Sequence, residues 1–166
     1  MKNIFILFVF LPVFCFSQNC KYSRNEVDEF TGKSIQTTKQ VIVYTGLFGG
    51  LGYKFTKINN SRYLEMGYSA LSIITIEKGD ALMFILGNGE KIELSAIESK
   101  VATPYTSQSS TIWGIEMDYF ISENDLLKMI NSPISKLRIY TKQGYVDKEV
   151  RENKAFKIQE AAKCIK

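Results

Sequence analysis

The feature that most constrains the fold of this chain is a repeated alternation of short β-forming segments with tight turns. Residues 35–44 are rich in β-branched and aromatic side chains and predict one long strand. Because turns containing Gly or Asn join most of the segments, the sequence predicts a mainly β fold, either an antiparallel β-sandwich or an open barrel. The further strands are predicted at residues 53–58, 62–68, 71–76, 81–86, 90–94, 115–121, 134–141 and 145–150. Residues 62–68 and 71–76 are either two strands or one long bent strand interrupted near Gly67.

Two helices are predicted toward the C-terminal end of this pattern. Ser122 is a good N-cap for a short helix that ends near Asn131, since acidic residues follow in its first turn. Residues 152–166 carry apolar side chains at a spacing close to helical. They predict an amphipathic C-terminal helix on the sheet, with Phe156 among its buried residues.

The first seventeen residues predict a cleavable signal peptide. A basic residue precedes an apolar run of about thirteen residues, which is shorter than the roughly 20 that cross a bilayer. Cleavage after Ser17 suits the small residues there, with cleavage after Gln18 or lipidation of Cys20 as alternatives. We therefore expect a signal peptide at residues 1–17, a single β-rich globular domain at residues 18–166, a periplasmic or secreted location, and no transmembrane segment after cleavage.

Charge and the absence of histidine exclude several classes of function. The formal net charge of +4 is scattered along the chain without a basic tract, so no nucleic-acid partner is expected. Without histidine the chain has no Ser-His-Asp or Cys-His centre and no His-ligated zinc. The acidic residues follow no calcium-loop spacing, so neither a cofactor nor a metal site is predicted.

The glycine-rich segment at residues 46–52 is the first candidate binding site. It lacks the ending of a phosphate-binding loop, and its simplest interpretation is a flexible hairpin connection. The functional alternative is that Leu47, Phe48 and Leu51 contact a partner or lipid, because exposed apolar side chains grouped on a loop are costly without a use.

The second candidate site is a Ser/Thr-rich surface loop predicted at about residues 101–110. Tyr105 and Trp113 flank it, and aromatic rings beside hydroxyl groups suit contact with carbohydrate or protein. The alternative is that Trp113 fills the core and the loop is simply solvated.

Cys20 and Cys164 are the two cysteines that remain once the leader is removed. In a compartment where disulfides form and persist, they are predicted to make one intramolecular disulfide. Two separate thiols or an intermolecular bridge are the alternatives.

Four short segments carry a resemblance to a group of known proteins: NCKY at 19–22, NEVDEFTG at 25–32, KGD at 78–80 and NGE at 88–90. The chain resembles uncharacterised small exported β-rich proteins of Gram-negative bacteria. This resemblance implies a periplasmic or secreted setting and no assigned activity.

Together these features predict an exported, non-enzymatic binding or structural domain, whose partner is a protein or a component of the cell envelope. The alternative function is a carboxylate-dependent hydrolase acting on envelope polysaccharide. That activity requires two carboxyl groups about 5 to 9.5 Å apart in a cleft.

Overall fold

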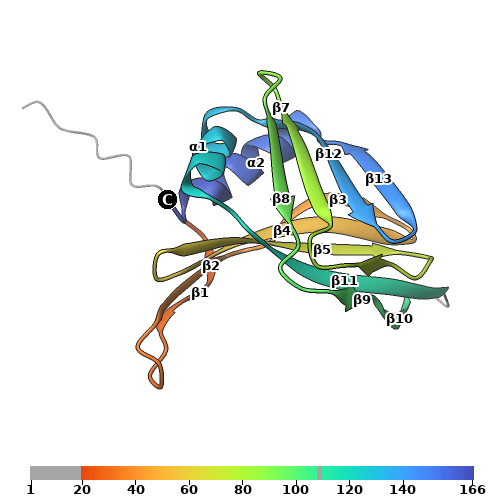
Figure 1. Cartoon of the computed structure of the whole chain (residues 1–166), viewed down its shortest axis with the longest axis horizontal. Coiled ribbons are helices and arrows are strands. Elements are labelled where there is room, and N and C mark those ends of the chain that lie inside the picture. Colours follow the sequence, from red (N-terminus) through yellow and green to blue (C-terminus); the bar gives the residue numbers. More distant parts are fainter. Residues whose placement is uncertain (1–19, 108–109) are drawn as a thin grey trace, which may run out of the picture.

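The computed structural model describes residues 20–107 and 110–166, so the predicted signal peptide at residues 1–17 lies outside the described residues. The described chain is mostly β, and its strand pairs are antiparallel. One sheet is curled into a half-barrel, a smaller sheet stands over it, and two short helices close one end (Figure 1). The prediction of a mainly β, antiparallel fold is confirmed.

The curled sheet has seven strands in the order β1-β2-β4-β5-β11-β10, with β3 also paired to β4. The strands are β1 (Tyr22–Val27), β2 (Ser34–Thr38), β3 (Val41–Gly46), β4 (Gly49–Ile58), β5 (Ser61–Ala70), β10 (Thr103–Ser107) and β11 (Ser110–Phe120). The prediction of one long strand at residues 35–44 is wrong, because the chain breaks between β2 and β3. These two strands pair with opposite ends of the same edge of β4.

Thr38 fills the gap that this break leaves on β4. The pairing with β2 ends at Thr56 and the pairing with β3 begins at Tyr53, so the backbone N–H of Phe55 lies between them. Thr38 is 1% exposed, and its Oγ1 accepts a hydrogen bond from that N–H at 3.0 Å. A side chain therefore supplies the acceptor that a continuous strand would have supplied.

The second sheet has four strands in the order β13-β12-β7-β8, and a third sheet pairs two very short strands. The strands of the second sheet are β7 (Ala81–Leu86), β8 (Lys91–Ser95), β12 (Ile134–Thr141) and β13 (Gly144–Glu149). The third sheet pairs β6 (Thr75–Ile76) with β9 (Lys100–Val101). The strands predicted between residues 81 and 94 and between residues 134 and 150 are present, and each pair forms an antiparallel hairpin.

The first helix, α1 (Glu123–Asn131), begins where the sequence predicted. Its N-cap is Ser122, whose Oγ accepts a hydrogen bond from the backbone N–H of Asp125 at 3.1 Å. No helix among the described residues has the length and hydrophobicity needed to cross a membrane.

The second helix, α2 (Glu152–Lys163), buries Ala155, Ile158 and Ala162. Phe156 is 58% exposed, contrary to the prediction. Successive helix residues are rotated by about 100°, so Phe156 is turned away from the face that its neighbours at spacings of three and four bury.

One hydrophobic core joins the two main sheets and both helices. The rings of Tyr53 on β4 and Phe84 on β7 meet edge to face, with centroids 5.9 Å apart. The hydroxyl groups of Tyr53 and Tyr119 lie in this core without a hydrogen-bond partner among the described residues. Burial raises the pKa of both phenols, so they stay neutral.

The predicted disulfide is confirmed. Cys20 is bonded to Cys164, and their Cα atoms are 5.6 Å apart. Nearby, the hydroxyl group of Tyr22 donates a hydrogen bond to the backbone oxygen of Cys164 at 2.8 Å. Both contacts attach the start of β1 to the end of α2.

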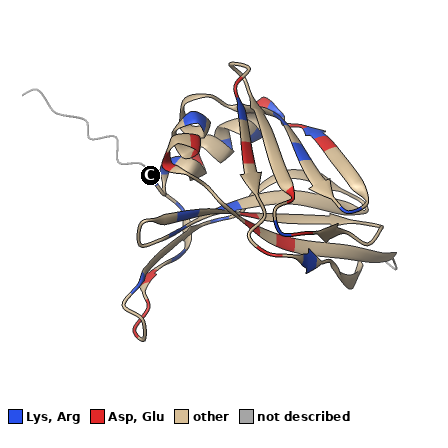
Figure 2. Cartoon of the chain, in the orientation of Figure 1, with Lys and Arg blue, Asp and Glu red and all other residues tan. Residues whose placement is uncertain are grey.

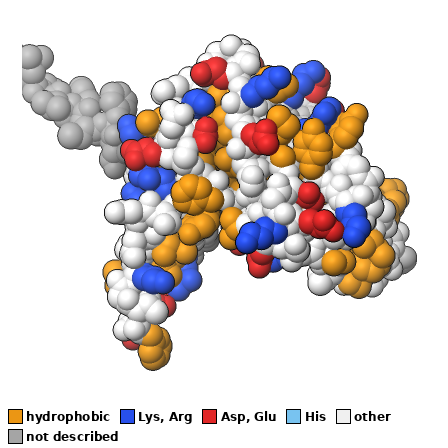
Figure 3. All heavy atoms as spheres, viewed as in Figure 1, with side chains coloured by type: hydrophobic (Ala, Val, Ile, Leu, Met, Phe, Trp, Pro, Cys, Tyr) orange, Lys and Arg blue, Asp and Glu red, His pale blue; other side chains and the backbone are white. Residues whose placement is uncertain are grey.

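The β1–β2 hairpin projects from the body of the molecule (Figure 1). Phe30 near its tip is 99% exposed, and an apolar side chain at the end of this hairpin is visible in Figure 3. Asp28 Oδ1 accepts hydrogen bonds from the backbone N–H groups of Phe30 and Thr31, which gives the turn a defined shape.

Candidate binding site

The outer face of the curled sheet carries a groove whose floor has almost no side chains. The groove has a volume of about 750 Å³. Gly50 and Gly52 of β4, Gly67 of β5 and Gly114 of β11 form its floor, and we call it the glycine groove. Gly52 is directly opposite Gly67, while Gly50 and Gly114 flank Ser69 in the next row.

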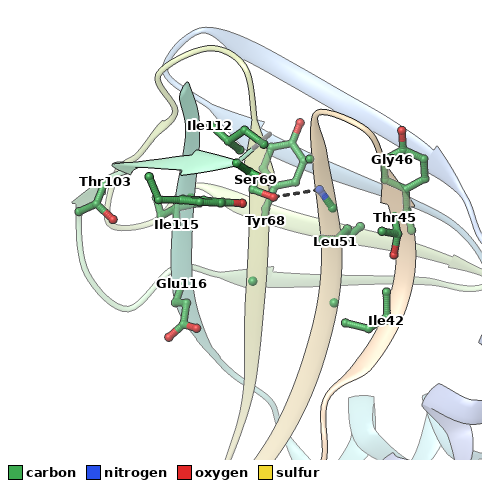
Figure 4. A pocket seen from close by; sticks show the side chains of 18 of the residues that line it. Ile42, Thr45, Gly46, Leu51, Tyr68, Ser69, Thr103, Ile112, Ile115 and Glu116 are labelled. Atoms are coloured by element: carbon green, nitrogen blue, oxygen red, sulfur yellow. Dashed lines mark hydrogen bonds between the residues drawn. The ribbon is translucent and has the colours of Figure 1, made fainter. Parts of the chain in front are cut away.

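The walls of the glycine groove come from both sides of this floor. Ile42 and Thr45 belong to β3, and Thr103 and Glu116 lie on the side of β10 and β11 (Figure 4). In the register of the sheet, Ile42 is opposite Gly52, and Thr103 is opposite Gly114. The two rows therefore run across the strands, so the groove is perpendicular to them.

Two long side chains lie over the glycine floor. A Cβ at Gly114 would be 3.0 Å from Cε1 of Tyr105, and a Cβ at Gly52 would be 2.7 Å from Nε2 of Gln40. Gln40 Nε2 would also be 3.2 Å from a Cβ at Gly67. The amide of Gln40 and the ring of Tyr105 thus approach the groove from opposite sides.

Only part of the glycine-rich segment at residues 46–52 forms the predicted hairpin connection. Residues 49–52 belong to β4 and not to a flexible loop, and the turn that joins β3 to β4 contains only Leu47 and Phe48. A Cβ at Gly49 would lie 2.1 Å from the backbone oxygen of Ser69, so this position requires glycine. The hydroxyl of Ser69 accepts a hydrogen bond from the N–H of Gly50 at 2.9 Å, drawn in Figure 4.

The prediction of a surface loop at about residues 101–110 is wrong for most of this segment. Its described residues form the end of β9 and the whole of β10, which pairs with β11 as an antiparallel hairpin. Strand pairing places Tyr105 opposite Ile112 and turns its ring onto the groove. Trp113 is half-buried and packs against the core.

The structure brings together members of both candidate sites. Leu47 from the first and Tyr105 from the second line the glycine groove, and they are 65% and 47% exposed. Leu51 borders the groove, but it is 2% exposed and belongs to the core. Phe48 is exposed in the turn without lining the groove, and Trp113 does not line it either.

A band of charge lies beside the glycine groove on the same face of the sheet. Lys54, Glu65 and Asp118 occupy one row, in which Lys54 and Glu65 form an ion pair. Burial lowers the pKa of Lys54, but the hydrogen bond and charge of Glu65 outweigh it and raise the pKa overall. Burial raises the pKa of Asp118, although the charge of Lys100 opposes this rise.

The lining of the glycine groove combines hydrogen-bonding groups with aromatic surface. Its lining offers an amide from Gln40, hydroxyl groups from Thr45, Ser69 and Thr103, and exposed aromatic rings. Glu116 is the one carboxylate among the lining residues that the structure describes. In the described ranges, no group of three or more acidic or cysteine side chains is arranged to hold a metal ion.

Sequence reasoning considered Glu116 only as a carboxylate for the hydrolase alternative and missed Gln40 and Ser69, although one signal for the floor was present. Glycines two apart in a strand share one face, so Gly50 and Gly52 mark a bare patch once β4 is known to begin at Gly49. Gln40 gave no signal, because its contact with two glycines depends on the break between β2 and β3.

Comparison with protein-family models, with curated proteins and with solved structures finds no match to this chain.

Proposed function

We propose that this protein is an exported, non-enzymatic binding domain whose glycine groove receives a carbohydrate chain of the cell envelope. The single observation that carries the proposal is the glycine floor flanked by Gln40 and Tyr105. Above this floor, the exposed amide of Gln40 offers a hydrogen-bonding group, and the exposed ring of Tyr105 offers a stacking surface for the apolar face of a sugar ring.

The direction of the groove favours a saccharide over an extended peptide. A peptide that adds to a sheet gains affinity from backbone hydrogen bonds along an exposed edge strand. The glycine groove instead crosses the face of the sheet, where the backbone groups of β4, β5 and β11 already bond to neighbouring strands. A ligand there must use amide, hydroxyl, carboxylate and aromatic side chains, which complement sugar hydroxyls and the apolar faces of sugar rings.

Two further features support an exported setting. The leader expected at residues 1–17 gives the route, and the disulfide between Cys20 and Cys164 is of a kind that persists in oxidising compartments. The proposal also takes the half-barrel as an open barrel, because an open arrangement leaves the outer face with the glycine groove free for a ligand.

The hydrolase alternative has no specific support among the described residues. A glycosidase pair needs two carboxyl groups facing one cleft, and Glu116 stands alone in the lining of the glycine groove. Asp147 and Glu149 line another cavity together, but both are in ion pairs. Asp147 pairs with Arg138, and Glu149 pairs with Lys136.

The test is a titration of the protein with soluble oligosaccharides of about three to four sugars, a length suited to a groove of this size. The probes are glycan-strand fragments of peptidoglycan and a neutral glucan of equal length, followed by backbone amide NMR. We expect the backbone amide signals of residues around the glycine groove to shift. Gly67→Leu, which places a side chain on the floor, and Tyr105→Ala should both abolish these shifts.

Tyr145→Ala is the matched control, since Tyr145 is an exposed tyrosine of β13 in the other sheet. This variant should bind like the natural sequence. If neither probe shifts the groove residues, or if Gly67→Leu binds as well as the natural sequence, the proposal is wrong.

A further inference from the structure

A second cavity, of about 530 Å³, lies between the disulfide, the link from β2 to β3 and one face of α2. Four lysines line it: Lys21, Lys39, Lys154 and Lys157, and we call it the lysine pocket. These residues come from three separate parts of the chain, so the fold and not the sequence brings their charges together. Figure 2 shows basic and acidic residues interspersed over the strands and helices.

The four ammonium groups of the lysine pocket are not paired with acidic side chains among the described residues. None of them has an ion pair or side-chain hydrogen bond among the described residues, and residues 1–19 and 108–109 contain no acidic side chain. The one acidic residue in the lining is Glu160, and its Oε1 already accepts from Lys163 Nζ at 2.7 Å.

The net charge of the molecule is concentrated in this pocket. The described residues have twenty basic and seventeen acidic side chains once Lys2 is set aside, a net charge of +3. The pocket lining alone has four lysines and one glutamate, which is also a net charge of +3. The remainder of the described chain is therefore neutral overall.

The backbone under these lysines is fixed before any ligand arrives. Lys21 follows the disulfide-bonded Cys20, and Lys39 follows Thr38, whose hydroxyl is buried in a hydrogen bond. Lys154 and Lys157 are three residues apart on α2 and share one helix face, where like charges destabilise the helix. A bound anion would remove this repulsion, and a rigid backbone reduces the entropy lost on binding.

We propose that the lysine pocket binds a phosphate-bearing ligand. Lysine ammonium groups act as point charges that suit phosphate oxygens, and the apolar side chains of Val41 and Ala161 line the same cavity beside them. This arrangement fits a phosphate monoester or diester attached to a less polar group. Free phosphorylated compounds and phospholipid headgroups share that chemistry.

The proposal is independent of carbohydrate binding in the glycine groove, although the two sites adjoin. Gln40 and Ile42 line both cavities. A phosphorylated saccharide could therefore occupy both, but each site is tested with its own probe and its own variants.

The experiment compares two double variants of the disulfide-bonded protein that lose the same charge. Lys154→Gln/Lys157→Gln removes two of the four lysine charges of the lysine pocket. Lys33→Gln/Lys78→Gln removes the charges of two exposed lysines that line neither cavity. One arm titrates inorganic pyrophosphate at low salt by backbone amide NMR. The other arm measures sedimentation with vesicles of phosphatidylcholine containing phosphatidylglycerol.

Binding of pyrophosphate should shift the backbone amide signals of residues around the lysine pocket. The affinity for either probe should fall by about tenfold in Lys154→Gln/Lys157→Gln. The control double variant should change by less than about twofold. Pyrophosphate binding identifies a free phosphate ligand, and binding of vesicles alone identifies a lipid headgroup. The proposal is overturned if neither probe binds or if both double variants weaken binding equally, which would indicate general charge attraction. Circular dichroism checks that both variants keep the fold.

Discussion

The substitution Thr38→Val removes the hydroxyl that fills the gap between β2 and β3. Thr38 Oγ1 is the acceptor for the buried N–H of Phe55, and valine has nearly the same shape without an acceptor. The variant should therefore lose a hydrogen bond and leave a buried N–H without a partner, while creating almost no cavity.

The magnitude follows from the burial of this contact. A hydrogen bond contributes about 0.5–1.5 kcal/mol net, and an unsatisfied buried donor costs about 1–3 kcal/mol. We expect the free energy of unfolding to fall by about 2 kcal/mol, measured from urea denaturation at an unchanged slope. The amide hydrogen of Phe55 should also exchange faster with solvent, since local opening no longer breaks a bond.

Two matched variants separate this mechanism from a general effect of substitution. Thr38→Ser keeps the hydroxyl and should keep the slow exchange of the Phe55 amide. Thr56→Val loses a partly buried hydrogen bond to Thr37, which water can replace, so its unfolding free energy should change by less than about 0.5 kcal/mol. A Thr38→Val variant as stable as the natural protein, with unchanged Phe55 exchange, would refute the argument.

Three further outcomes test other features of the fold. Replacing Cys20 and Cys164 with serine opens a covalent loop that spans 144 residues. The free energy of unfolding should therefore fall by up to about 5 kcal/mol, and an unchanged urea midpoint would contradict this. Phe30→Ala should leave stability within about 0.5 kcal/mol, because the ring is 99% exposed, and a loss well above that would show that the hairpin tip packs on the body. Burial raises the folded-state pKa of Asp118, so its ionisation opposes folding: Asp118→Asn should be more stable than the natural protein at neutral pH. This advantage should shrink as pH falls through the raised pKa, and denaturation curves showing a constant difference down to acid pH would rule out the cause.

Local signals in the sequence were sufficient where an element depends mainly on its own residues. Helix α1 was predicted because its N-cap and its acidic first turn lie within one short segment. The disulfide was predictable because only two cysteines follow the leader. The hairpin of β12 and β13 was marked by β-forming segments on both sides of Gly144.

Contacts between distant segments explain what the sequence could not show. Residues 35–44 have strand propensity throughout, and only the register of β4 decides that they form two strands. The segment around Tyr105 has the composition of a loop, but pairing with β11 makes it a strand. The glycine groove needed three strands to be placed side by side, so its floor could not be recognised from Gly67 or Gly114 singly.

The bond between Cys20 and Cys164 also determines how the protein would respond to mechanical force. A load applied across these two residues would pass through one covalent bridge between Cα atoms 5.6 Å apart. The intervening chain would bear no tension, so its hydrogen-bonded strands could not be pulled apart in sequence. While the bridge is intact, the β-structure with both cavities would keep its shape under such a load, and reduction would be needed before the chain could extend.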